Sequence, residues 1–248
     1  MKRIVIIGAT SGIGLALARL CLQKGYRVGG CGRTVSALEE LKSAYPAQFE
    51  FERLDIRDTG QIPQVLNTLI SKLGGMDICV VASSIGGSSA GLDWQKEFDA
   101  IQTNVVGYSA VLNFAAQYFI KNGSGHLAGI TSLTKYFGFR NASYNASKAF
   151  EAVYLQSLRL KLEKNNIRVT EIVPGFVDTP MVKENPQMFW LVPVEKAARQ
   201  ILQALEDRKN TVYISRRWRL MSWLLPLLPF FVIRYFYIKE QKLKKTDG

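Results

Sequence analysis

The sequence predicts an α/β fold built on one doubly wound parallel sheet with helices on both faces. Short apolar runs rich in β-branched residues alternate with helix-like segments along most of the chain. A glycine-rich turn follows the first apolar run directly, before a helical pattern begins. The length of 248 residues suits one such domain with a sizeable core.

The expected elements follow one another in regular alternation. Helix starts are marked by Asp58 and Thr59 and by Pro193, and the alternation implies right-handed crossovers between parallel strands. We find no internal repeat and no low-complexity linker, so we expect a catalytic domain over 1–215 and a C-terminal tail over 216–248. Strands are predicted at 3–7, 26–31, 49–54, 76–82, 126–132, 167–173 and 211–214, and helices at 12–24, 34–44, 58–73, 95–121, 142–165 and 193–207.

The turn after the first strand has the composition of a phosphate-binding loop. Gly8 permits a tight turn, while Gly12 and Gly14 let the backbone approach a pyrophosphate and let the next helix pack closely on the strand. The N-terminus of that helix supplies free N–H groups and a partial positive charge. The glycine spacing is G-x-x-x-G-x-G rather than G-x-G-x-x-G. The loop predicts a bound dinucleotide in a Rossmann-type domain.

Tyr144 and Lys148 form the most informative pair of side chains. They lie four residues apart in a helix-like segment and therefore share one helix face. A free tyrosine has a pKa of about 10, and a neighbouring ammonium favours its phenolate, which suits general acid–base catalysis near neutral pH. Taken alone, the pair also fits a solvated helix face; the glycine loop favours catalysis.

Together these motifs resemble the short-chain dehydrogenase/reductase superfamily over about residues 2–215. A P-G-x-x-x-T segment at 174–179, which borders the nicotinamide in the family, ends at Thr179. The resemblance implies an NADP-dependent carbonyl reductase in which Ser132 and Tyr144 hold the carbonyl oxygen and Tyr144 donates the proton. Lys148 would hold the nicotinamide ribose and connect through water to the region of Asn104. The implied catalytic set is Asn104, Ser132, Tyr144 and Lys148.

The chain departs from the family pattern at two places. Residues 81–84 (Val-Ala-Ser-Ser) replace the usual N-N-A-G sequence, a change that affects local packing more than hydride transfer. Ser132 precedes Tyr144 by 12 residues, one fewer than expected, which indicates a shortened loop over the substrate. Thr131 offers an alternative hydroxyl, but side chains alternate along a strand and we favour Ser132.

The end of the second strand predicts the choice of cofactor. An acidic residue there would bind the adenosine ribose and repel a 2′-phosphate, and none is present. Arg33 instead offers a guanidinium suited to phosphate, although it also fits a solvated helix start. We therefore predict NADP(H). Its predicted contacts are Gly8, Thr10, Ser11, Gly12, Ile13, Gly14, Arg33, Thr34, Asp55, Ile56, Tyr144, Lys148 and Thr179.

Cysteine and histidine usage gives no sign of a metal site or a disulfide framework. The three cysteines fall in apolar helix or strand patterns, and His126 is the only histidine. Residues 1–3 lead straight into the first strand, which predicts no secretory signal. We expect a cytoplasmic protein whose thiols stay reduced.

Two apolar segments bear on the substrate. Residues 181–192, after Thr179, contain Met181, Met188, Phe189, Trp190 and Leu191, which indicate either an apolar lid or core packing. Residues 220–233 carry no charge and are flanked by basic residues. The segment from residue 213 to the end has a net charge of +6, half of the +12 of the whole chain.

The apolar run of the tail would span about 21 Å as a helix, short of the ~30 Å hydrocarbon core of a bilayer. Pro226 and Pro229 would also kink or break it. We therefore expect an interfacial segment with Trp218, Trp223, Tyr235 and Tyr237 at headgroup level and cations on anionic lipid. A tail folded on its own domain or across a dimer partner is the alternative, and nucleic acid is much less favoured.

The sequence thus predicts an NADPH-dependent reductase of a long-chain or lipid-like ketone, of 3-oxoacyl or 3-ketosphinganine type. It would act as a homo-oligomer, peripheral at the inner face of a membrane. Two alternatives remain open: a membrane-associated cofactor-binding scaffold or sensor with little turnover, and a soluble reductase of small carbonyls.

Overall fold

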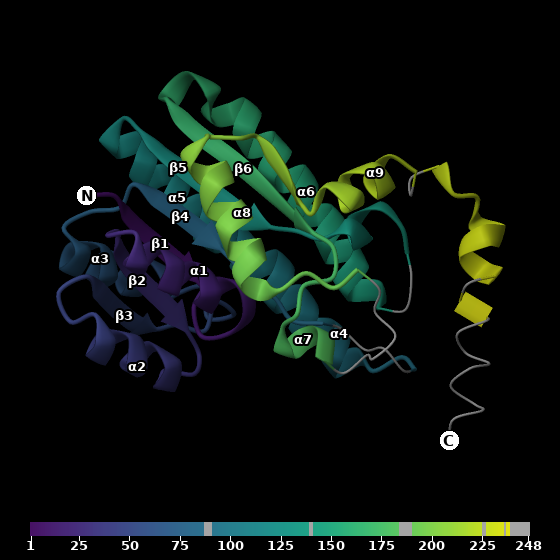
Figure 1. The fold of residues 1–248 in the computed structure, drawn as a ribbon, viewed down its shortest axis with the longest axis horizontal. Helices are drawn as coiled ribbons and strands as arrows, with labels where there is room; N and C mark the ends of the chain where they lie inside the picture. The colour runs from purple at the N-terminus through teal and green to yellow at the C-terminus, as the bar shows by residue number, and fades with distance from the viewer. Residues whose placement is uncertain (87–90, 139–140, 184–189, 225–226, 236, 239–248) are drawn as a thin grey trace.

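The computed structural model describes residues 1–86, 91–138, 141–183, 190–224, 227–235 and 237–238. Within them, seven parallel strands form one sheet in the order β3-β2-β1-β4-β5-β6-β7, with helices on both faces (Figure 1). The predicted fold class is therefore confirmed. The strands are β1 (Arg3–Ile7), β2 (Arg27–Gly32), β3 (Phe49–Arg53), β4 (Ile78–Val81), β5 (Gly125–Ile130), β6 (Ile167–Pro174) and β7 (Thr211–Ile214).

The helices occupy the segments between the strands and follow the last of them. The strand order reverses between β1 and β4, which is where open α/β sheets bind ligands at the carboxyl ends of their strands. The α-helices are α1 (Gly12–Gln23), α2 (Ser36–Ala44), α3 (Ile62–Leu73), α4 (Trp94–Ile101), α5 (Tyr108–Asn122), α6 (Ala142–Leu162), α7 (Pro180–Lys183), α8 (Val194–Glu206) and α9 (Arg216–Leu224). Shorter turns are a π-helix η1 (Gln102–Gly107) and the 3₁₀-helices η2 (Leu133–Tyr136) and η3 (Glu163–Asn165).

Strand β1 shows why the apolar runs were readable as strands. Ile4 and Ile6 enter the core on the face covered by α1 and α8, while Val5 and Ile7 enter the core beneath α3 and α5. All four are almost completely buried, because a central parallel strand is covered on both faces. Burying each such side chain contributes about 1.5–3 kcal/mol to stability.

Two predicted helices differ from those observed. The pattern at 95–121 is divided into α4, η1 and α5. Gly107 lets the π-helix η1 approach the segment after β3, because a Cβ at Gly107 would lie 2.4 Å from the Ile56 carbonyl oxygen. Helix α3 begins at Ile62 rather than near 58, and Asp58 accepts a hydrogen bond from the Gln61 amide in the turn before it. The short elements η2, α7 and α9 were not predicted.

Helix α9 packs onto the domain mainly through Trp218, with Met221 beside it. Trp218 is 4% exposed, and its ring meets the Phe176 ring edge-on at a centroid distance of 5.3 Å. Gly175 leaves the space it needs, since an added Cβ would lie 2.2 Å from Trp218 Nε1. The described residues after α9 run away from the sheet in Figure 1. The predicted tail thus begins with a turn that belongs to the core, and the prediction that Trp218 lies at headgroup level is wrong, because its ring is buried against the domain.

Candidate active site

The predicted catalytic side chains gather at the carboxyl ends of the central strands and at the start of α6. Tyr144 lies in the first turn of α6 and Lys148 one turn later, and Lys148 Nζ lies 5.5 Å from the centroid of the Tyr144 ring. Tyr144 is half-buried, whereas Lys148 is 1% exposed. The helical spacing therefore brings the two groups together as expected.

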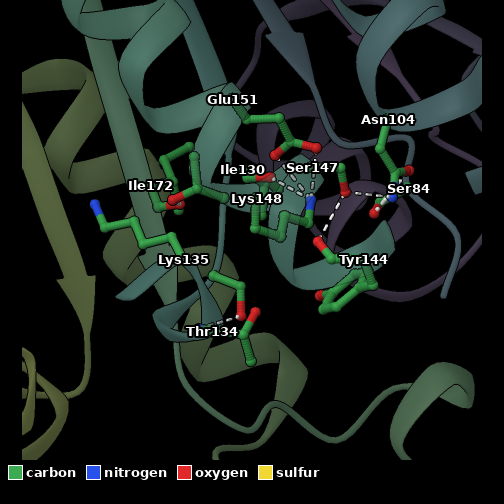
Figure 2. A network of polar contacts seen from close by, with 12 residues as sticks. Ser84, Asn104, Ile130, Thr134, Lys135, Tyr144, Ser147, Lys148, Glu151 and Ile172 are labelled. Carbon is green, nitrogen blue, oxygen red and sulfur yellow. Dashed lines mark hydrogen bonds and ion pairs between the residues drawn. The ribbon is translucent and has the colours of Figure 1, made fainter. Parts of the chain in front are cut away.

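The Lys148 ammonium is held by acceptors from two elements (Figure 2). Its Nζ donates to the carbonyl of Ile130 at the end of β5 (3.1 Å) and contacts both Glu151 carboxylate oxygens (3.0 and 2.9 Å). Glu151 is completely buried. This residue was not predicted as part of the site, although its position three residues after Lys148 is a helix-pairing spacing that could have shown it.

The two candidate hydroxyls at the end of β5 have different surroundings. Thr131 is buried and its hydroxyl donates to the Glu171 carboxylate (2.9 Å) and lies 3.2 Å from the Ile172 carbonyl. Ser132 is only half-buried, and its hydroxyl accepts from the Thr134 backbone N–H (3.2 Å). The Thr131 hydroxyl is therefore engaged within the sheet, which supports Ser132 as the hydroxyl of the site.

Asn104 ties three segments together from within the π-helix η1. Its amide nitrogen donates to the Ile85 carbonyl (2.8 Å) and to the Ser147 hydroxyl (3.1 Å). Its oxygen accepts from the Ser84 hydroxyl (3.2 Å) and the Ile85 N–H (3.0 Å). Asn104 thus fixes the segment after β4, where the family's N-N-A-G sequence is replaced, against α6.

The glycine loop fits a bound phosphate group. Gly8 has φ +91°, and a Cβ there would lie 2.6 Å from the Ser83 backbone nitrogen; at Gly14 it would lie 2.1 Å from the Gly8 carbonyl oxygen. Helix α1 therefore packs against the end of β1 as only glycine allows. Its N-cap residue, Ser11, makes no side-chain capping bond, so the first-turn N–H groups have no capping partner.

Comparison with known proteins identifies the family. The sequence model of the short chain dehydrogenase family matches residues 2–189. The chain belongs to this family. An uncharacterized oxidoreductase of Myxococcus xanthus is 33% identical over 187 residues, which are 73% of this chain and 74% of the relative. The predicted family and the predicted enzyme class, an oxidoreductase, are therefore confirmed.

Two further relatives carry more specific names. A proposed ketoacyl reductase of Streptomyces coelicolor is 31% identical over 205 residues, 78% of each chain. A short-chain dehydrogenase from Sphingobium yanoikuyae, solved in complex with NADPH, has a TM-score of 0.79 at 19% identity, covering 90% of this chain and 92% of that one. The second likeness is one of fold.

In the present protein, the residues predicted to contact the 2′-phosphate lie beside the glycine loop. Arg33 and Thr34 are exposed just after β2. The last residue of β2, Gly32, packs against Thr10 of the glycine loop so closely that an added Cβ would lie 2.4 Å from Thr10 Cγ2. Asp55 makes a 2.6 Å ion pair with Arg57, a residue that was not predicted. The hydrogen bond from Arg57 is the largest cause that lowers the pKa of Asp55, and attraction to Arg33 adds to it.

The remaining predicted contacts divide between the site and the core. Thr179 lies over the glycine loop, since a Cβ at Gly12 would lie 3.3 Å from its Cγ2. The Ile56 side chain is buried in the core; its predicted contact with the cofactor stays a prediction. Of the predicted lid, residues 184–189 lie outside the described residues, Met181 is exposed, and the Trp190 ring meets Trp218 edge-on at 5.5 Å.

The cysteines and the histidine are core residues in the structure. Cys21, Cys31 and Cys79 are free and buried. His126 Nε2 lies 2.7 Å from the Thr170 hydroxyl, and burial lowers the pKa of His126 to about 4, which keeps the ring neutral. Across the described ranges, no cluster of three or more His, Cys, Asp or Glu side chains has the geometry of a metal site.

Proposed function

We propose that the protein is an NADPH-dependent reductase that converts a long-chain or lipid-like ketone to an alcohol at a membrane surface. The observation that carries the proposal is the buried Lys148 ammonium, 5.5 Å from the Tyr144 ring. Taking an ammonium out of water costs several kcal/mol even when it is paired. A cofactor-binding scaffold has no use for a cation in that place, whereas a proton-donating tyrosine does.

Each side chain has a distinct part in the proposed reaction. NADPH, when bound, supplies the hydride. The first turn of α1 would bind the pyrophosphate, Arg33 and Thr34 the 2′-phosphate, and Lys148 the nicotinamide ribose. Ser132 would donate a hydrogen bond to the carbonyl oxygen, and Tyr144 would transfer its phenolic proton to the same oxygen as negative charge develops there. The resulting phenolate is stabilised by Lys148 until water returns the proton.

Two comparisons support the choice of cofactor and substrate class. The structural neighbour from Sphingobium yanoikuyae was solved with NADPH, which agrees with the guanidinium that Arg33 offers where NAD-dependent enzymes carry a carboxylate. The Streptomyces coelicolor relative is named as a proposed ketoacyl reductase. An acyl-chain ketone is therefore the substrate class that we favour.

The C-terminal tail supports attachment to a membrane surface. None of the described helices is both long and apolar enough to cross a bilayer. Beyond the packed Trp218, however, large apolar side chains face water, with basic side chains beside them. Apolar groups flanked by cations suit the boundary of an anionic leaflet. The exposed apolar residues of this segment include Leu220, Trp223, Leu224, Leu227, Phe230 and Phe231, and the exposed cations include Arg217, Arg219 and Arg234.

The same tail adjoins the substrate end of the proposed site. Trp218 of α9 contacts Phe176, which follows Pro174-Gly175 in the predicted nicotinamide-bordering segment, and Trp190, which belongs to the predicted lid segment 181–192. A lipid-bound tail would therefore bring the lid region close to the bilayer. A substrate with a hydrocarbon chain would then have a short path from the membrane to Tyr144.

A chain-length series tests this function. NADPH oxidation is followed with ketones from short and polar to long-chain 3-oxoacyl esters, with and without anionic vesicles. We expect rates to rise with chain length and with vesicles, and the vesicle effect to be smaller in a variant that ends at Leu224, which keeps Trp218 in place. Fastest turnover of small polar ketones, unaffected by vesicles, would favour a soluble carbonyl reductase.

We also propose a homo-oligomer, as the sequence analysis predicted. A groove of about 620 Å³ lies between α3, α5 and α6 and is lined mainly by apolar side chains, among them Val106, Phe114, Phe150 and Tyr154. A second copy that presents the same α5–α6 face would cover it. Light scattering should give a multimer for the wild type and a monomer for Phe150→Glu; a monomeric wild type would contradict the proposal.

A further inference from the structure

The buried carboxylate of Glu151 has no assigned part in the reaction described above. Both of its oxygens lie within 3.0 Å of Lys148 Nζ, and neither side chain is more than 2% exposed. In Figure 2 the Lys148 ammonium lies between the Glu151 carboxylate and Tyr144, all three on α6. Lys148 therefore presents its charge to Tyr144 from one side and to Glu151 from the other.

The groups around Glu151 come from four elements. Glu171 of β6 is buried nearby, where Lys135 of η2 pairs with it and the Thr131 hydroxyl donates to it. Tyr108 of α5 faces the same region, and its buried hydroxyl has no hydrogen-bond partner among the described residues. Burial, opposed by Lys148 and assisted by Glu171, raises the pKa of Glu151 to about 7. Glu151 thus changes charge within the pH range in which enzymes work.

The charge of Glu151 alters what Lys148 does to its neighbours. An ionised carboxylate in contact with the ammonium cancels part of the field that favours the Tyr144 phenolate. It also competes with ribose hydroxyls for the ammonium N–H groups. A protonated Glu151 does neither. Lys148 therefore stabilises the Tyr144 phenolate and binds ribose hydroxyls more strongly when Glu151 is protonated than when it is ionised.

We propose that Glu151 is a positioning residue of this reductase, which holds the Lys148 ammonium beside Tyr144 and sets the pH range over which Tyr144 can give up its proton. The inference rests on the proposed function. Glu151 lies outside the motif of Tyr144 and Lys148, and the inference is that it controls the proton affinity of Tyr144 through Lys148. In the reducing direction, Tyr144 must be protonated, so an ionised Glu151 extends activity to higher pH.

The pH dependence of turnover tests the proposal. Glu151→Gln keeps an acceptor for Lys148 but removes the charge, and kcat/KM for ketone reduction is measured from pH 5.5 to 9.5. We expect the variant to match the wild type below about pH 7 and its alkaline limb to fall about half a unit to one unit earlier. Glu163→Gln, at an exposed glutamate in the turn after α6, is the matched control and should follow the wild type.

Two further results separate a role of the Glu151 charge from a role in packing alone. Glu151→Asp keeps the charge and should restore the wild-type alkaline limb. If Glu151→Gln lowers kcat/KM by the same factor at every pH, Glu151 only fills the core and the inference is overturned.

The affinity for NADPH tests the role of Glu151 independently of turnover. If no ketone is reduced, the proposed function is wrong, but the affinity measurement still tests the inference. The Kd for NADPH should rise in the wild type as the pH rises through about 7, and this rise should be absent in Glu151→Gln. The 2′-phosphate titrates equally in both proteins, so only the difference between them counts. Identical pH dependences would overturn the inference.

The ion pair is tested without any ligand. Glu151→Met, Lys148→Met and the double variant Lys148→Met/Glu151→Met form a cycle with the wild type. If the two groups pair at pH 8, Lys148→Met should lower the melting temperature more in the wild type than in the Glu151→Met background. An equal effect of Lys148→Met in both backgrounds would show that the two groups do not pair, which overturns the inference.

Discussion

Thr179 lies against Gly12, so closely that a Cβ added to the glycine would come within 3.3 Å of the threonine Cγ2. Gly12 begins α1, just after the turn that follows β1, and Thr179 lies in the segment between β6 and α7, far away in the sequence. Their contact closes one side of the space above the central strands. The loop proposed to hold the pyrophosphate and the segment proposed to border the nicotinamide therefore lie side by side.

Gly14→Ala tests the close packing of the proposed phosphate loop. The added Cβ would lie 2.1 Å from the Gly8 carbonyl oxygen, a backbone atom that cannot move without shifting the loop. We expect a loss of about 1–3 kcal/mol in the free energy of unfolding, as for other overpacked sites, and greatly weakened NADPH binding. Gly60→Ala is the control, because its Cβ would meet only Asp58 at 3.6 Å. A Gly14→Ala protein with normal stability and NADPH affinity would contradict this geometry.

Arg33→Asp tests the selection of NADPH over NADH. The carboxylate would face the 2′-phosphate in place of a guanidinium, and charged hydrogen bonds contribute about 1.5–3 kcal/mol, or roughly one to two orders of magnitude in affinity. We expect the ratio of NADH to NADPH affinity to rise by that factor, measured by fluorescence titration. Arg19→Asp, on an exposed position of α1, should leave the ratio unchanged. An unaltered ratio for Arg33→Asp would mean that Arg33 is only a solvated residue.

The raised pKa of Glu151 predicts a pH-dependent stability difference. Its ordinary value is 4.5 and burial raises it to about 7, so the folded state binds the proton more tightly than the unfolded state. The resulting stabilisation is complete below about pH 4.5 and is lost as the pH rises through about 7. We expect the free energy of unfolding of the wild type, relative to Glu151→Gln, to fall over this range in denaturant titrations. A constant difference would be contrary to the raised pKa.

His126 acts on stability in the opposite sense. Its pKa is lowered from 6.5 to about 4, so its contribution is lost as the pH falls below about 6.5. Both slopes fall in one pH window, and the absolute stability curve therefore mixes them. The difference between the wild type and Glu151→Gln isolates the carboxylate, because His126 is the same in both proteins.

The two tryptophans of α9 should respond in different ways to substitution. Trp218 is 4% exposed and packs on Phe176, so Trp218→Ala should cost about 3–5 kcal/mol in stability. Trp223 is 71% exposed, and Trp223→Ala should leave stability unchanged but weaken co-sedimentation with anionic vesicles. Added salt should weaken the contribution of the cations and spare that of the apolar groups. Equal vesicle binding by wild type and Trp223→Ala at all salt concentrations would count against the membrane surface.

Much of the fold was predictable because the central strands are buried on both faces. In β1, alternate residues enter different cores, and an uninterrupted apolar run is the only pattern that satisfies both. The division of the helix at 95–121 was not predictable in the same way. A π-helix keeps the apolar character of its neighbours, and the close approach of Gly107 to the Ile56 carbonyl involves a residue far away in the sequence.

The candidate site was predictable where its spacing is local. Tyr144 and Lys148 meet because a helix brings residues four apart to one face. Glu151 was missed because a lysine and a glutamate three residues apart usually form a solvated pair, and nothing in that spacing reveals complete burial. The partners of Asn104 come from the segment after β4 and from α6, and only tertiary structure assembles them.

The most direct test of the reductase mechanism is the comparison of Tyr144→Phe with the wild type in NADPH oxidation, with NADPH affinity measured on both. Phenylalanine keeps the ring beside Lys148 and removes only the hydroxyl. We expect kcat to fall by about 10²–10⁴-fold, the usual contribution of a general acid, while the Kd for NADPH stays within about threefold. Wild-type turnover by the Tyr144→Phe protein would show that the proton comes from another group and that the proposed mechanism is wrong.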